Sequence, residues 1–143
     1  MKDIMLKLKG LQTGFDGEEE ETEFVTEGKL YKRNGSYYLL YEESEISGME
    51  GCHTSLKYND KFLRMKRSGE ALGKYTVIEF NKDKRFNSVY QTPYGPIEME
   101  VLTNRYEQKL TEDGIGSILI DYNINLIGLA ASRNKLDITI SEQ

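Results

Sequence analysis

Residues 22–43 read TEFVTEGKLYKRNGSYYLLYEE and carry the clearest structural signal in the chain. The Asn34-Gly35 pair lies between two runs of β-branched, aromatic and other apolar residues. Both residues tolerate positive φ, so an Asn-Gly pair in this position is typical of the tight turn of a β-hairpin. In the first run, every second residue from Phe24 to Leu30 shares one face. The stretch therefore predicts antiparallel strands over residues 22–32 and 36–43.

The same period of two recurs along the rest of the chain. Alternating apolar and polar residues predict strands over residues 3–9, 52–58, 61–67, 74–80, 85–92, 97–106, 117–126 and 135–141. Asn59-Asp60 predicts a second tight hairpin, and Pro93 is expected to end a strand because Pro cannot donate to a ladder. A short irregular turn is expected within residues 105–114.

These strands define the fold class. About ten strands follow one another with hairpin-length connections and almost no helical periodicity, which predicts an all-β, antiparallel, up-and-down meander in one domain, residues 1–143. Closure removes the two exposed edges of such a meander, so we expect a barrel of about eight to ten strands. The alternation places Ile118, Ile120 and Tyr122 on the inner face and Asp121 and Asn123 on the outer one.

Composition limits the classes of partner. The chain has 143 residues and a formal net charge of −5, which argues against nucleic acid or an anionic membrane as partner. The single cysteine, Cys52, excludes an intrachain disulfide and suits a reducing compartment. The first residues lack the apolar core of a signal peptide, and we expect a cytoplasmic protein. Acidic residues from Asp16 to Glu23 lack the spacing of a calcium loop and are expected to form an exposed loop.

The second half of the chain carries a family resemblance. Its pattern comprises Arg67-Ser68-Gly69, Tyr90-Gln91-Thr92-Pro93-Tyr94-Gly95, Met99, Thr103, Ile118-Leu119-Ile120-Asp121-Tyr122 and Leu136-Asp137-Ile138-Thr139-Ile140. The chain thereby resembles the YwiB-like family of small bacterial proteins, a domain of unknown function. The resemblance implies a calycin-like barrel, related in architecture to lipocalins, and implies no activity.

Catalytic signatures are weak. Cys52 and His53 are adjacent, so on a strand they point to opposite faces and cannot share one metal or substrate. Zinc coordination by nitrogen and sulfur would need further His or Cys residues, which the chain lacks. Asp121 and Asp137 lie at outward positions, with nothing to pair them for acid–base chemistry. We therefore expect no enzyme, no cofactor and no metal.

Polar residues on apolar faces are the candidate site. Arg67 follows Leu63 and Met65 at period two, Tyr90 and Thr92 share a face with Phe86 and Ser88, and Tyr122 lies within an Ile/Leu face. With Tyr94, these residues could present one guanidinium and several hydroxyls to a ligand. The alternative is a purely structural role, in which the tyrosines expose their hydroxyl groups to solvent at the barrel rim and Arg67 ends its strand in solvent.

Two function hypotheses follow, from different classes. The first is a binding protein that holds a small, partly apolar and anionic ligand in the barrel mouth. The second is a protein-interaction module with a filled core, suggested by the acidic surface and by Tyr37, Tyr38, Tyr41 and Tyr58, which are expected to be exposed. A cavity of several hundred Å³ would favour the first, and a densely packed core the second.

Overall fold

The computed structural model describes residues 1–14, 16–42, 52–69, 75–92 and 95–143, and every helix or strand element in them is a β-strand. The strands are β1 (Lys2–Gly14), β2 (Glu19–Arg33), β3 (Ser36–Glu42), β4 (Cys52–Tyr58), β5 (Phe62–Gly69), β6 (Tyr75–Asn81), β7 (Phe86–Thr92), β8 (Gly95–Leu110), β9 (Gly116–Leu126) and β10 (Ala130–Glu142). In these ranges no helix is long and apolar enough to cross a membrane.

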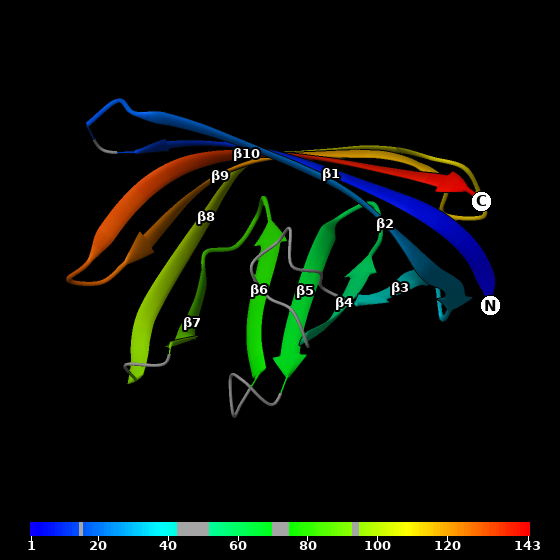
Figure 1. Cartoon of the computed structure of the whole chain (residues 1–143), viewed down its shortest axis with the longest axis horizontal. Coiled ribbons are helices and arrows are strands. Elements are labelled where there is room, and N and C mark those ends of the chain that lie inside the picture. The colour runs from blue at the N-terminus through cyan, green and yellow to red at the C-terminus, as the bar shows by residue number, and fades with distance from the viewer. Residues whose placement is uncertain (15, 43–51, 70–74, 93–94) are drawn as a thin grey trace.

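All ten strands belong to one antiparallel sheet that curls into a nearly closed barrel (Figure 1). The strand order is β6-β5-β4-β3-β2-β1-β10-β9-β8-β7, so the first and last strands are neighbours. The long ladder between β1 and β10 runs from Ile4↔Glu142 to Gly14↔Ser132. The predicted up-and-down barrel is thereby confirmed. Its seam lies between the consecutive strands β6 and β7, which are the two ends of the sheet.

The predicted inner faces form the core. Ile4, Leu6, Val101, Ile118, Ile120 and Ile138 are fully buried. On β3 to β6 the inward residues form cross-strand rows, and two of these rows are mostly apolar. The first comprises Tyr37, Tyr58, Leu63 and Phe80, and the second comprises Leu39, Leu56, Met65 and Ile78. Both pack in or against one hydrophobic cluster.

One end of the barrel is tied together by tyrosine hydroxyls. Tyr58 donates a hydrogen bond to the Gly114 carbonyl at 2.9 Å, and Tyr37 donates to the Glu112 carbonyl at 2.8 Å. Tyr106 donates to the carbonyls of Asn59 and Phe62 at 2.9 and 3.0 Å. These bonds join the β4–β5 turn and β3 to β8 and the β8–β9 turn. Burial raises the pKa of Tyr58 and Tyr106, because it disfavours the charged phenolate.

The turn at Asn34-Gly35 is confirmed, with φ values of 50° and 79°. Two other local predictions are wrong. Residues 105–110 continue β8 instead of forming a turn, because a bulge between Thr103 and Arg105 restores the inward direction of the strand. Glu19, Glu20 and Glu21 belong to β2 instead of a loop, because pairing with β1 holds them.

Candidate ligand-binding site

A row of polar side chains crosses the inner face of β3 to β6. Tyr41, Thr54, Arg67 and Thr76 are successive cross-strand partners, one row beyond the apolar rows. Tyr41, Thr54 and Thr76 are all buried. We call these four residues the polar row. It concentrates three hydroxyls and one guanidinium at the barrel end opposite the tyrosine bonds.

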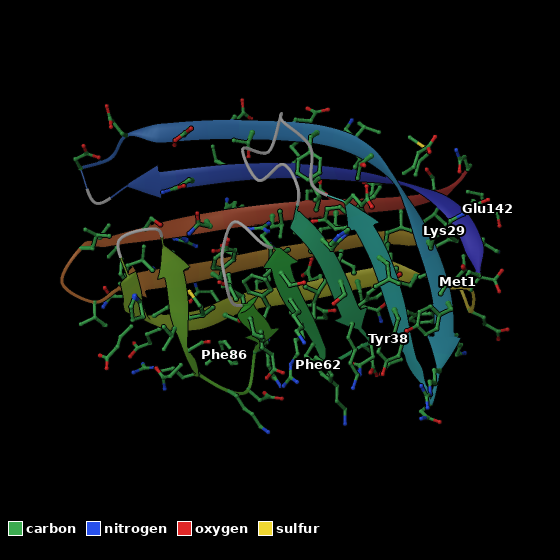
Figure 2. The ribbon with its side chains drawn as sticks, turned by 60° about the horizontal axis from the view of Figure 1, so that its bottom comes forward. Met1, Lys29, Tyr38, Phe62, Phe86 and Glu142 are labelled. Atoms are coloured by element: carbon green, nitrogen blue, oxygen red, sulfur yellow. The ribbon has the colours of Figure 1, made fainter. Side chains whose placement is uncertain are left out.

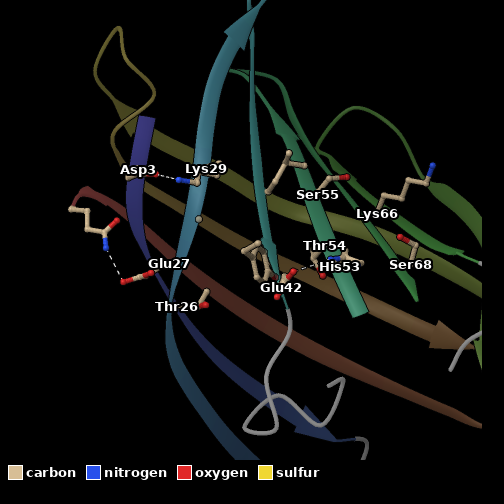
Figure 3. A pocket seen from close by; sticks show the side chains of 14 residues that line it. Asp3, Thr26, Glu27, Lys29, Glu42, His53, Thr54, Ser55, Lys66 and Ser68 are labelled. Carbon is tan, nitrogen blue, oxygen red and sulfur yellow. Dashed lines mark hydrogen bonds and ion pairs between the residues drawn. The ribbon is translucent and has the colours of Figure 1, made fainter. Parts of the chain in front are cut away.

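A cavity of about 1070 Å³ opens in the wall of the barrel beside this row (Figure 3). Its lining includes Tyr41 and Thr54 of the polar row together with Thr26 and Gly28 of β2. The cavity lies where β2 and β3 diverge, since their ladder ends at Lys29↔Leu40. A Cβ on Gly28 would lie 2.9 Å from the Leu40 carbonyl oxygen, so glycine permits the close approach at that point.

Outward residues complete the cavity and give it mixed charge. Asp3 and Lys29 form an ion pair, His53 lies 3.7 Å from Glu42, and Lys66 contributes a cation from β5 (Figure 3). The cavity is therefore a side opening of the barrel wall, whereas the sequence predicted a site in the axial mouth. The difference arises from the divergence of β2 and β3, which the alternation of residues does not encode.

Arg67 points into the barrel, as the period-two pattern predicts. Its strand continues to Gly69, so the interpretation that Arg67 ends its strand in solvent is wrong. The Nε atom is buried, and Nη2 lies 3.9 Å from the Met65 sulfur. Thr54, which lines the cavity, is the direct cross-strand partner of Arg67. Arg67 itself does not line the cavity, and its link to the cavity wall is through Thr54.

Tyr122 faces the same interior from β9. Its ring packs against Phe80 with centroids 4.5 Å apart. Burial raises the pKa of Tyr122 to about 12, and the positive charge of Arg67 acts in the opposite direction. The structure therefore brings Arg67 and Tyr122 within electrostatic reach of each other, although they lie on opposite walls.

For the other three predicted site residues, Tyr90, Thr92 and Tyr94, no side-chain position is described. Tyr90 and Thr92 lie in β7, where their backbones pair with Ile97 and Gly95. The structure describes only the backbone at these two positions. Tyr94 lies outside the described residues.

Sequence reasoning missed three members of the polar row: Tyr41, Thr54 and Thr76. Each occupies an inward position of a predicted strand, so the alternation that singled out Arg67 could also have found them. Tyr41 and Tyr58 were expected on the surface, and this is wrong: they are 4% and 0% exposed. Tyr37 and Tyr38 are half-buried. Tyr41 and Tyr58 are buried because the burial of a tyrosine ring in a core outweighs the exposure of one hydroxyl.

The residues weighed for catalysis stay apart. His53 is exposed on the outer face, beside Glu42. Asp121 lies on the outer face as predicted, where it is largely covered and forms an ion pair with Arg133 at 2.8 Å. Within residues 1–14, 16–42, 52–69, 75–92 and 95–143, no group of three His, Cys, Asp or Glu side chains is placed to hold a metal.

The fold and the polar row define an antiparallel β-barrel with a polar inner end and a side cavity. The family described as "Domain of unknown function (DUF1934)" matches residues 6–138, and the chain belongs to this family. The crystal structure of ywiB protein from Bacillus subtilis has the same fold, with a TM-score of 0.81 and 23% sequence identity over 99% of this chain and 92% of that chain. The predicted resemblance is thus confirmed. No curated protein matches the chain.

Proposed function

We propose that this protein binds a small, partly apolar, anionic ligand in the cavity between β2 and β3. The observation that supports the proposal is the polar row, in which Arg67 is the direct cross-strand partner of Thr54, a residue of the cavity wall. Arginine offers a planar fork of donors suited to a carboxylate or phosphate group. A cation held beside a cavity in an acidic protein is a selective site for such a group.

The size and lining of the cavity support a small-molecule ligand. Typical ligand pockets have volumes of about 300–1,000 Å³ and combine apolar walls with a few polar groups. Here Leu40 supplies apolar surface, and Thr26, Thr54 and Ser55 supply hydroxyls. Tyr122 adds a phenol hydroxyl in the same interior, and burial raises its pKa to about 12. Tyr90, Thr92 and Tyr94 remain predicted ligand contacts.

The proposal includes no catalytic step. The proposal includes calycin-like ligand binding, which the barrel architecture supports. It includes a cytoplasmic location, which the single cysteine supports. It includes no nucleic-acid or membrane partner, which the net charge of −5 supports. Of the four tyrosines that suggested an interaction module, Tyr41 and Tyr58 are buried and Tyr37 and Tyr38 are half-buried, which leaves the acidic surface as the main support for that hypothesis.

Titration with the apolar anion anilinonaphthalene sulfonate tests the proposal. We expect one-to-one binding to the wild-type protein and affinity weaker by about tenfold or more for Arg67→Ala, because charge-assisted hydrogen bonds are lost. Arg64→Ala is the matched control. Arg64 lies on the same strand but points outward to Glu79, at 2.7 Å, and its loss should leave the affinity unchanged.

Two measurements make the result decisive. Thermal unfolding of each variant shows whether a loss of binding reflects a loss of folded protein. Native mass spectrometry of protein purified from its own host looks for a co-purifying anion, which Arg67→Ala should release. Equal affinities of the folded Arg67→Ala and Arg64→Ala variants would refute a site built on Arg67.

A further inference from the structure

The N-terminal half of β2 has a neighbouring strand on one side only. β1 pairs with β2 along nearly its whole length, from Lys2↔Leu30 to Thr13↔Glu19. β3 pairs only with Lys29–Arg33. Among the described residues, Glu19–Gly28 therefore forms a free edge beside β1 and β10 (Figure 2). We call this segment the β2 edge.

The backbone groups along the β2 edge point in known directions. Arg33 and Ser36 flank the two-residue Asn34-Gly35 turn, so they form a hydrogen-bonded pair that directs the backbone groups of Arg33 toward β3. Backbone groups alternate in direction along a strand. The N–H and C=O groups of Glu23, Val25 and Glu27 therefore point to the β3 side, where no described strand meets them. These residues present the donors and acceptors that an added strand needs.

The side chains on the outer face of the edge select the added strand. Glu21, Glu23, Val25 and Glu27 are all exposed, and Val25 is 55% exposed. Lys7 forms an ion pair with Glu23 at 3.2 Å, and Gln143 donates a hydrogen bond to Glu27 at 2.7 Å. Lys9, the cross-strand partner of Glu23, is a second exposed lysine on this face. Two lysines do not balance three carboxylates, so the outer face keeps a net negative charge around Val25.

We propose that the β2 edge binds an extended, basic segment of a partner protein, which adds to the sheet as an antiparallel strand. Side chains directly opposite one another are the pairs that stabilise a sheet. The partner therefore carries Lys or Arg opposite Glu27, Glu23 and Glu21, and an apolar residue opposite Val25. Main-chain hydrogen bonds supply affinity and these pairs supply specificity, as in other cases of strand addition.

Charge excludes a second copy of this chain as the occupant. Two β2 edges placed together would oppose glutamates to glutamates, and like charges directly opposite one another destabilise a sheet. Acidic side chains on an edge also keep neutral and acidic strands away. A basic segment is the class of strand that the edge attracts.

The experiment uses a labelled peptide, acetyl-Lys-Thr-Val-Val-Lys-Thr-Lys-amide, whose residues oppose Glu27 to Glu21 in order. Fluorescence anisotropy measures its affinity for the full chain. We expect at least about tenfold weaker binding when both lysines that oppose Glu23 and Glu27 become glutamate, and a similar loss when backbone nitrogens facing the edge are N-methylated. Amide exchange should slow on binding at Glu23, Val25 and Glu27, with little change at Phe24 and Thr26, which already face β1.

Variants of the protein test the same register. Val25→Pro removes an edge N–H at a position where proline is tolerated, and it should abolish binding, whereas Val25→Thr should bind normally. Glu23→Lys with Glu27→Lys should reverse the preference toward the glutamate peptide, and Glu98→Lys on β8 should have no effect. If Val25→Pro does not fold, the N-methylated peptide tests the edge alone. Equal binding of the methylated peptide, or unchanged exchange at Val25 and Glu27, would overturn the proposal.

Discussion

Gly114 lies in the turn between β8 and β9, directly against two tyrosines. Its φ is +82°, a Cβ there would lie 2.5 Å from the Tyr37 ring, and its carbonyl accepts the hydrogen bond of Tyr58. Gly128, in the next turn, has nearly the same φ, +80°, but no heavy atom within 4 Å of a Cβ built there. Substitution of either glycine therefore has the energetic cost of a positive φ, and only substitution of Gly114 adds the cost of a steric clash.

We therefore expect Gly128→Ala to lower the free energy of unfolding by about 1 kcal/mol, the ordinary cost of a positive φ. Gly114→Ala should cost about 1–3 kcal/mol more, because the new methyl group displaces the Tyr37 ring. Urea unfolding of both variants measures the difference. Equal costs would show that Tyr37 does not press on this turn.

At the scale of the element, β8 depends on one extra residue. Thr103 pairs with Tyr122 and Arg105 pairs with Asp121, which leaves Asn104 as the bulge. The bulge turns Tyr106 inward, where its hydroxyl bonds to the carbonyls of Asn59 and Phe62. Without Asn104, the rest of the strand would slip by one residue and its inner and outer faces would exchange.

Deletion of Asn104 should accordingly cost on the order of 3 kcal/mol or more, because Tyr106 and Leu110 would leave the interior. Asn104→Ala keeps the extra residue and should cost much less. Chemical denaturation followed by circular dichroism compares the two. A deletion variant as stable as Asn104→Ala would mean that the bulge does not set the faces of β8.

Asp121 links β9 to β10 and β8 through Arg133 and Asn104. The hydrogen bonds from Arg133 lower the pKa of the Asp121 carboxyl. The carboxylate therefore contributes stability above its unfolded pKa of about 3.9, and this stability is lost as pH falls through the folded-state pKa. We expect Asp121→Asn to be less stable than the wild type near pH 7, and the difference should vanish in acid, once the pH is below the lowered folded-state pKa of Asp121.

The control for Asp121 is Glu107→Gln. Glu107 pairs with Arg105 at 2.8 Å, but both side chains are more than half exposed, at 54% and 58%. Exposed pairs contribute little, so this variant should unfold like the wild type at both pH values. A pH-independent cost of Asp121→Asn would contradict a role for the charge.

The whole molecule is a meander whose ends meet. The ladder between β1 and β10 joins the chain termini (Figure 1). In the part of the chain that the structure describes, β6 and β7 have no such ladder; the turn 82–85 connects them, with an isolated bridge between Asn81 and Lys84. A chain opened at the seam would keep every ladder of the sheet. The seam of the sheet therefore lies between β6 and β7, whereas the strands that contain the chain termini are paired with each other.

A circular permutant that starts at Asp83, with Met1 and Gln143 joined by a short Gly/Ser linker, should fold into the same barrel with a nearly unchanged Tm. A second permutant, opened at Gly128 between the paired strands β9 and β10, should lose more stability because it separates a long hairpin. Thermal unfolding ranks the two. The opposite order would show that β6 and β7 hold the barrel more firmly than their missing ladder suggests.

The amino-acid sequence determined the strands, their faces and the tight hairpins. The reason is that these features are local: a period of two fixes which side of a strand each residue occupies, and Asn34-Gly35 fixes the turn that joins two strands. The inward direction of Arg67 and Tyr122 and the burial of Ile118 and Ile120 followed from that alternation alone. The barrel itself followed from the need to remove exposed edges.

Only the tertiary structure decided which residues of other strands these faces contact. The approach of Arg67 to Tyr122, the cavity at Gly28, the bulge at Asn104 and the free edge at Val25 depend on how strands distant in sequence pair and twist. Such pairing is set by the packing of the whole core and by the summed twist of the sheet. A period of two contains no information about where two neighbouring strands diverge, and for that reason the candidate site became visible only in the folded barrel.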